Sequence, residues 1–109
     1  MIPQLRPAEV KAARAAAADS PEIVLLDVRE LPELALSSLP EVVHIPMGDI
    51  PRRLDELDPD SAIVVMCHHG VRSMRVALFL KQQGFSDVSN LRGGIDAWSL
   101  ELDPAVPRY

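Results

Sequence analysis

The sequence predicts an α/β fold in which helices cover both faces of a mainly parallel sheet. Short apolar runs of strand length alternate along the chain with longer segments of helical pattern. These runs lack the polar alternation of half-exposed strands, which indicates burial on both faces and therefore a parallel sheet. A length of 109 residues is typical of one domain, so we expect a single domain over residues 1–109.

Helices and strands are predicted in turn through the first half of the chain. An Ala-rich segment predicts a helix over 7–18, and an apolar run that ends in Asp predicts a strand over 23–26. A short helix over 32–39 and a second strand over 42–45 follow. A segment with Pro in its first turn then predicts a helix over 51–57.

The second half continues the same alternation. The clearest buried strand is 62–66, and an almost entirely apolar helical pattern follows over 73–83. Gly84 is suited to cap that helix at its C-terminus. A last strand over 88–91 leads through Gly93-Gly94 into a final helix. Ligands of such sheets bind beyond the carboxyl ends of the strands, where we therefore look for a site.

Composition limits the classes of partner and compartment. The formal net charge of −5 disfavours nucleic acid and anionic membranes as main partners. No apolar run approaches the roughly 18 residues needed to cross a bilayer, and the N-terminus lacks a secretion signal. A single Cys cannot form an internal disulfide, so we expect a cytoplasmic protein. The sequence leaves the oligomeric state open.

Acidic residues are unevenly placed, and the gap between them indicates a candidate site. From Ser61 to Ser86 there is no Asp or Glu, whereas this segment contains Arg72, Arg75 and the only Cys, Cys67. A carboxylate-free basic segment in an acidic protein is typical of an anion site, although the same pattern also arises by chance.

Cys67 directly follows a predicted strand and precedes a predicted helix. Backbone N–H groups lack partners at such a position and the helix dipole is positive there, so we expect several amides to point at the sulfur. Gly70 permits the tight curl, Arg72 adds a positive charge and Ser73 can cap the helix. These influences favour the thiolate and make Cys67 the candidate nucleophile. A sulfur shielded from solvent and surrounded by hydrocarbon would contradict this prediction and favour an inert core thiol.

Four motifs occur in an order and spacing that span nearly the whole chain. They are LDVRE at 26–30, HIP at 44–46, CHHGVR at 67–72 and GGIDAW at 93–98. Together they resemble the rhodanese family of sulfurtransferases, in which a persulfide-forming Cys lies in a six-residue loop. The resemblance implies a three-layer rhodanese-like fold with about five strands and no cofactor. It also implies a substrate-binding loop that consists, with the nucleophile Cys67, of His68, His69, Gly70, Val71, Arg72 and Ser73.

The resemblance implies a two-step transfer. Cys67 takes a sulfane sulfur from an anionic donor such as thiosulfate, and a thiophilic acceptor then removes it. The acceptor is cyanide, a thiol or a carrier protein. Because the chain has no second Cys, the persulfide must be discharged by an external acceptor.

Two other functions fit the same architecture. Cysteine phosphatases and arsenate reductases also place a thiolate in an amide-lined loop, but their loops have five residues between Cys and Arg. Four residues lie between Cys67 and Arg72, and the shorter loop favours sulfur over phosphate. A non-catalytic binding module with the same fold is the second alternative, although such modules generally lose the Cys or the loop.

Histidines near the loop raise the question of a metal. We expect none, because adjacent side chains such as His68 and His69 diverge in a tight loop and no second Cys completes a zinc site. These two residues are instead expected to shape the mouth of the site or to contact the acceptor. His44 lies in an apolar strand, and we interpret it as a structural histidine.

Three further residues have competing interpretations. Asp27 and Arg29 lie at the carboxyl edge of the sheet and are candidates for the edge of the pocket. A structural ion pair of Arg29 with Glu30 or Glu33 is the more common alternative. Trp98 is expected to pack in the core against the last strand.

The C-terminal segment 103–109, DPAVPRY, resembles the tail of rhodanese domains fused behind adenylating enzymes that sulfurate ubiquitin-like carriers. The resemblance implies a docking segment for a protein partner. The alternative is a Pro-rich strap that covers an edge of the core.

Overall fold

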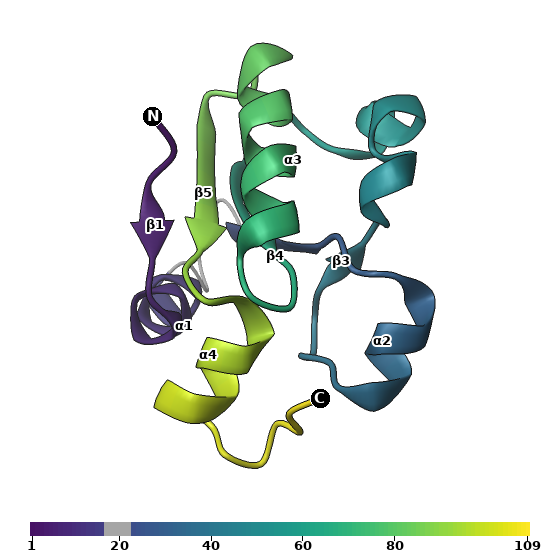
Figure 1. Ribbon diagram of the computed structural model, residues 1–109. Coiled ribbons are helices and arrows are strands. Elements are labelled where there is room, and N and C mark those ends of the chain that lie inside the picture. The colour runs from purple at the N-terminus through teal and green to yellow at the C-terminus, as the bar shows by residue number, and fades with distance from the viewer. Residues whose placement is uncertain (17–22) are drawn as a thin grey trace.

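A computed structural model describes residues 1–16 and 23–109 of the chain, and its described strands form one parallel sheet (Figure 1). The strand order is β1-β5-β4-β2-β3, with every described pair parallel. The bounds are β1 (Gln4–Leu5), β2 (Ile23–Asp27), β3 (Val43–His44), β4 (Ala62–Met66) and β5 (Asp87–Leu91). The predicted parallel sheet of about five strands is therefore confirmed.

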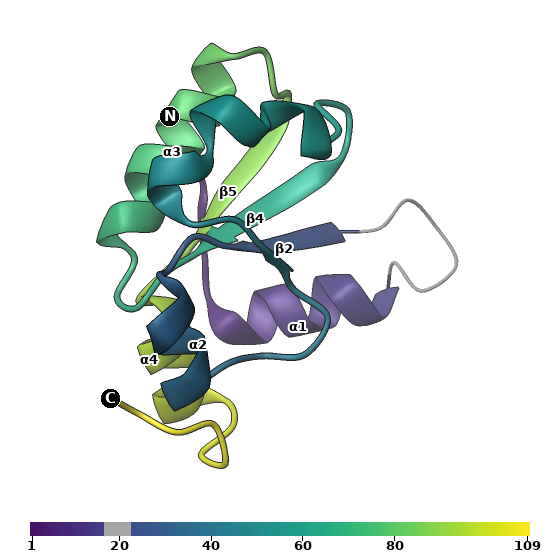
Figure 2. The same cartoon turned by 90° about the vertical axis from the view of Figure 1, so that its right-hand side faces the viewer.

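Helices lie on both faces of this sheet, as predicted. They are α1 (Pro7–Ala16), α2 (Leu31–Leu36), α3 (Val71–Gln82) and α4 (Gly94–Glu101), with the 3₁₀ helices η1 (Met47–Asp49) and η2 (Pro51–Glu56). Figure 2 shows α3 and the 3₁₀ helices on one side of the sheet and α1 on the other. The chain after α4 runs back toward α2. No helix within the described residues has the length and apolar character needed to cross a membrane.

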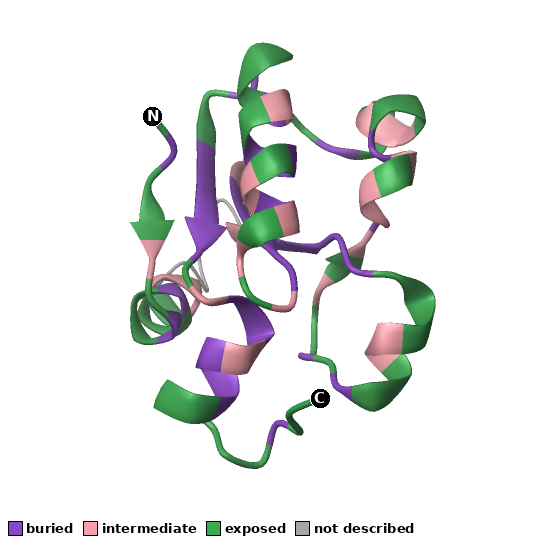
Figure 3. Cartoon of the chain, viewed as in Figure 1, coloured by how far each residue is buried: buried purple, intermediate pink, exposed green. Residues whose placement is uncertain are grey.

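Alternate side chains of the central strands enter two separate apolar clusters. Leu26 and Val65 pack in the cluster that contains Val76 of α3. Their neighbours Leu25 and Val64 point to the opposite face, where the cluster contains residues of α1 and α4. This alternation explains why the strands read as continuous apolar runs. Figure 3 shows most of β5 buried, between β1 and the more exposed α3.

The last helix and the glycine caps agree with prediction. Trp98 is buried and belongs to the same cluster as Leu91 at the end of β5. Gly84 follows the last residues of α3 with a φ of +94°, the left-handed conformation expected of a C-terminal glycine.

Several element bounds differ from prediction. Strand β1 was not predicted, and α2 ends three residues early because Ser37 is extended, with φ −162° and ψ 136°. The segment after β3 forms a 3₁₀ helix interrupted at Arg53 rather than a regular helix. Helix α3 begins at Val71, two residues before the predicted start. The last two predicted positions of the first helix, 17 and 18, lie outside the described residues.

Candidate active site

Cys67 lies in a turn between the end of β4 and the start of α3, as its sequence position predicts. Gly70 is the residue before the first turn of α3, and its φ of 99° requires glycine or a strained side chain. The chain therefore turns back at Gly70 and presents the N-terminus of a twelve-residue helix to the cysteine.

The sulfur of Cys67 has two polar neighbours. The backbone N–H of Gly70 donates to Sγ at 3.0 Å, and the Ser73 hydroxyl oxygen lies 3.3 Å from it. Of the several amides that we expected, one forms a hydrogen bond with Sγ among the described residues. A backbone donor and the positive end of α3 both stabilise negative charge on this sulfur.

Asn90 fixes the geometry around Cys67 and was not identified from the sequence. Its amide nitrogen donates to Gly70 O at 3.1 Å and to the Gln4 side chain at 3.0 Å. Its carbonyl oxygen therefore faces Ser73 and accepts the Ser73 hydroxyl at 2.5 Å. A hydroxyl has one proton, and that of Ser73 is donated to Asn90. The Ser73 oxygen therefore accepts the hydrogen bond from the Cys67 thiol. The signal available in the sequence was an Asn next to the last residue of the predicted strand 88–91.

Ser73 does not cap α3, so that expectation is wrong. The position before the first turn is occupied by Gly70, which has no side chain for capping, because the turn requires its left-handed backbone. Ser73 lies inside the helix, fully buried, and points toward Cys67 and Asn90.

The start of α4 supports the loop from the other side. The Ile95 amide donates to Cys67 O at 2.9 Å, and the Asp96 amide donates to His68 O at 3.2 Å. Gly94 has a φ of +64°, and a Cβ at this position would lie 2.5 Å from Cys67 O. Gly94 therefore lies directly against the backbone of the cysteine loop.

Cys67 is shielded from solvent, contrary to the accessibility that the prediction requires. Only 1% of the residue is exposed, and it packs within the apolar cluster beneath α3. The reason is that its thiol points inward to Ser73 rather than outward to the mouth of the loop. The surroundings are nevertheless not purely hydrocarbon, because Gly70 N and the Ser73 hydroxyl contact the sulfur.

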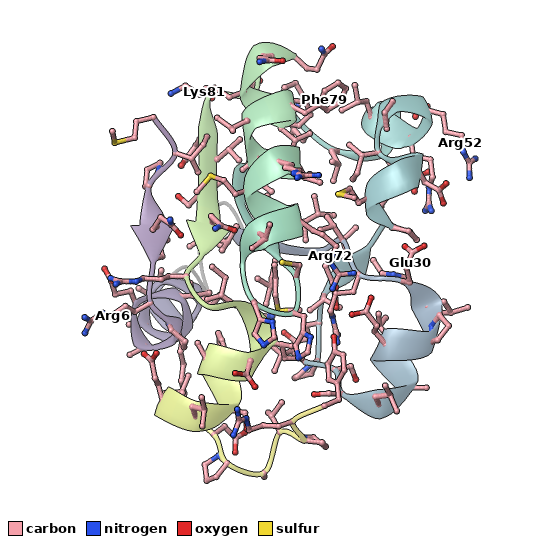
Figure 4. All side chains as sticks on the ribbon, in the orientation of Figure 1. Arg6, Glu30, Arg52, Arg72, Phe79 and Lys81 are labelled. Carbon is pink, nitrogen blue, oxygen red and sulfur yellow. The ribbon has the colours of Figure 1, made fainter. Side chains whose placement is uncertain are left out.

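Arg72, in the first turn of α3, forms a two-point ion pair with Glu33 of α2. Its two terminal nitrogens lie 2.7 and 2.8 Å from the carboxylate oxygens. Figure 4 shows Arg72 between the first turn of α3 and the start of α2, where Glu30 lies. Hydrogen bonds from Arg72 lower the pKa of Glu33 to about 2 despite the opposing effect of burial. The same hydrogen bonds raise the pKa of Arg72 above its usual value.

His68 and His69 stack on each other instead of diverging, so that expectation is wrong. Their ring centroids are 3.9 Å apart, and the other face of His68 is covered by Tyr109 at 3.8 Å. The Tyr109 ring holds His68 in this orientation, whereas the His69 side chain stays 61% exposed. Burial, followed by the charge of His69, lowers the pKa of His68.

A metal is poorly accommodated by these histidines. His68, His69 and Asp96 bring their ligand atoms within 4.8 Å of one another. A metal ion lies in the plane of each imidazole that binds it, so two rings stacked 3.9 Å apart cannot both bind one ion. Asp96 also accepts a hydrogen bond from Arg108 at 2.8 Å. The prediction of no metal stays a prediction.

Asp27 and Arg29 form a fully buried ion pair at 2.7 Å. The alternative of a structural ion pair for Arg29 is therefore confirmed, but its partner is Asp27 rather than Glu30 or Glu33, whose carboxylates take part in the capping of α2. The role of Asp27 and Arg29 at the edge of the pocket stays a prediction. The carbonyl of Arg29 contacts the His44 ring at 2.7 Å, which confirms His44 as a structural histidine.

The C-terminal segment reaches this region as a strap. Val106 is buried, and its carbonyl accepts the Ser99 hydroxyl at 2.7 Å. Tyr109 extends to the loop, where its hydroxyl accepts from Arg29 at 3.0 Å and donates to Glu33 at 2.7 Å. No pattern in the sequence indicates that Tyr109, 42 positions beyond Cys67, contacts the cysteine loop.

Comparisons with known proteins agree with this geometry. A model of the Rhodanese-like domain matches residues 9–101. The chain belongs to the rhodanese-like family. The chain is 47% identical over 83 residues to the putative sulfurtransferase YtwF of Bacillus subtilis, covering 76% of this chain and 80% of that protein. It is 39% identical over 85 residues to the thiosulfate sulfurtransferase GlpE of Actinobacillus pleuropneumoniae, covering 78% and 79%.

The rhodanese-like fold is also seen in solved structures. The crystal structure of a rhodanese-related protein from Thermoplasma volcanium superposes with a TM-score of 0.80 at 29% identity. The match covers 92% of this chain and 93% of that one.

Proposed function

We propose that this chain is a sulfurtransferase that carries a sulfane sulfur as a persulfide on Cys67. The observation that carries the proposal is the position of the Cys67 sulfur, which accepts the Gly70 amide at the N-terminus of α3. In this proposal, the loop residues from His68 to Ser73 surround the sulfur donor. The names of the relatives YtwF and GlpE, both sulfurtransferases, support the proposal.

In the first step, the Cys67 thiolate attacks the outer sulfur of a donor such as thiosulfate. A sulfur–sulfur bond forms to Cys67, the sulfur–sulfur bond of the donor breaks, and sulfite leaves with the electron pair. The Gly70 amide and the positive end of α3 stabilise the charge on the thiolate and then on the persulfide. The thiol proton passes to solvent before attack.

In the second step, a thiophilic acceptor attacks the outer sulfur of the persulfide and the Cys67 thiolate leaves. The acceptor is cyanide, a small thiol or a carrier protein, and the reaction takes place in the cytoplasm. Because Cys67 is 1% exposed, donor and acceptor enter when the loop or the Tyr109 segment moves aside. The chain acts in this proposal as a single domain without a cofactor.

The test is mass spectrometry of the protein after incubation with thiosulfate. We expect a gain of one sulfur atom on Cys67, and its loss as thiocyanate when cyanide is added. A Cys67→Ser variant loses both signals. Absence of labelling in the wild type would contradict the proposal and favour a binding module, and hydrolysis of an aryl phosphate by Cys67 would instead support the phosphatase alternative.

A further inference from the structure

The charge of Arg72 is already paired in the absence of a donor. Both terminal nitrogens of its guanidinium are hydrogen-bonded to Glu33, at 2.7 and 2.8 Å. An anion a few Å away therefore meets a positive and a negative charge together, whose fields largely cancel. The loop offers such an anion much less net attraction than an unpaired arginine would.

Glu33 is fixed in this position by two groups besides Arg72. Its Oε2 also accepts the Glu30 amide at 2.9 Å, and its Oε1 also accepts the Tyr109 hydroxyl at 2.7 Å. Together with the two bonds from Arg72, each carboxylate oxygen has two donors. With a pKa of about 2, Glu33 stays ionised throughout the neutral range, and turning away would break all of these bonds.

The Glu33 charge acts on the loop itself. Arg72, its partner, belongs to the cysteine loop, and the Tyr109 ring whose hydroxyl donates to Glu33 stacks on His68, the residue next to Cys67. Two further ion pairs lie near this site among the described residues. Asp96 pairs with Arg108 at 2.8 Å, and Asp27 pairs with Arg29, whose guanidinium donates to the Tyr109 hydroxyl. The charges of these residues are therefore paired, as that of Arg72 is.

We propose that Glu33 is a donor-selectivity residue, which disfavours dianionic sulfur donors relative to donors with a single negative charge. This inference rests on the proposed sulfur transfer. The favoured class is the organic thiosulfonates, R–SO₂–S⁻, and thiosulfate is the disfavoured dianion. In both cases Cys67 bonds to the outer sulfur and the S–S bond of the donor breaks. A sulfinate leaves with the electron pair in one case and sulfite in the other.

The test compares two donors that differ by one charge. The kcat/KM values for thiosulfate and for methanethiosulfonate are measured with cyanide as acceptor, in wild type and in Glu33→Gln. Glutamine still caps α2, so the variant is expected to fold. Removal of one negative charge near the donor raises the ratio of thiosulfate to methanethiosulfonate kcat/KM by about fivefold. The thiosulfate kcat/KM of Glu33→Gln also falls more steeply than that of wild type between about 20 and about 200 mM salt.

Two control variants separate charge from packing. Glu56→Gln removes a glutamate that pairs in the same two-point manner with Arg53, at 2.7 and 2.8 Å, on η2. We expect its donor ratio to equal that of wild type. Tyr109→Phe removes the hydrogen bond from the hydroxyl to Glu33 and the one that it accepts from Arg29, but leaves Glu33 charged, so its ratio changes by less than about twofold.

The outcomes distinguish this inference from the proposed function. If both donors label Cys67 but Glu33→Gln leaves the ratio unchanged, the inference about Glu33 is overturned and sulfur transfer stands. If neither donor labels Cys67 in the wild type, the proposed function itself is overturned.

Discussion

Gly94 is the residue whose lack of a side chain matters most to the cysteine loop. A Cβ there would lie 2.5 Å from Cys67 O and would also contact the His68 carbonyl, both rigid backbone groups. We expect Gly94→Ala to lower the free energy of unfolding by about 3 kcal/mol, from this overlap and from its positive φ. Urea unfolding measures the loss, and thiosulfate labelling of Cys67 is expected to slow at least about tenfold because the loop is displaced.

Two other glycines separate the causes of that effect. A Cβ on Gly48 meets nothing within 4 Å and has no positive φ, so Gly48→Ala is the neutral control. Gly84 also has open space but a φ of +94°, so Gly84→Ala reports the backbone strain alone. Equal destabilisation by Gly84→Ala and Gly94→Ala would show that overlap with the loop carries no cost.

Residues of the site were predictable where the chain itself places them together. Cys67 and Gly70 lie in one turn, and the strand-loop-helix pattern was sufficient to locate them. Asn90, Glu33 and Tyr109 reach the loop from a neighbouring strand, a different helix and the C-terminal segment. Their contacts depend on strand order and on how the tail folds back, which local pattern does not determine.

Elements were predicted best where burial imposes a long, uniform pattern. Strand β4 has the predicted bounds because its five apolar residues pack on both faces. Strand β1 has only two residues, too few to show any period, and it forms because Gln4 and Leu5 pair with the edge of β5. Helix η2 departs from the prediction at Arg53, where φ is −117° and the chain leaves helical geometry.

The C-terminal segment controls the environment of His68 through one ring. Tyr109 stacks on His68 at 3.8 Å, and burial is the main cause of the lowered pKa of His68. We expect Tyr109→Ala to expose the imidazole and raise the pKa of His68 toward its ordinary value of about 6.5. NMR titration of the His68 ring protons measures this shift. An unchanged His68 titration would show that the tail does not bury the ring.

At the scale of the whole molecule, Glu33 joins three parts of the chain. It lies on α2, pairs with Arg72 at the start of α3, and accepts the hydroxyl of Tyr109 from the C-terminal segment. Helices α2 and α3 were predicted from the sequence, but the contact that Glu33 makes between them and the C-terminal segment was not. Because the three parts are far apart in sequence, this contact forms only in the folded state, and its ion pair with Arg72 requires an ionised Glu33.

Stability is therefore expected to depend on Glu33 at acid pH. Its pKa is about 2 when folded, against 4.5 for an ordinary glutamate, so the unfolded chain binds the proton more readily. The ionised contact contributes fully above about pH 4.5 and is lost as the pH falls toward about 2, with an upper bound of about 3 kcal/mol. Urea unfolding of wild type and Glu33→Gln at about pH 6, 4 and 3 should show a stability difference that shrinks as the pH falls. Glu56→Gln, whose carboxylate is exposed on η2, is expected to show a much smaller difference at each pH. A difference for Glu33→Gln that is constant over this range would mean that the Glu33 contact stabilises the fold through packing and neutral hydrogen bonds, not through its charge.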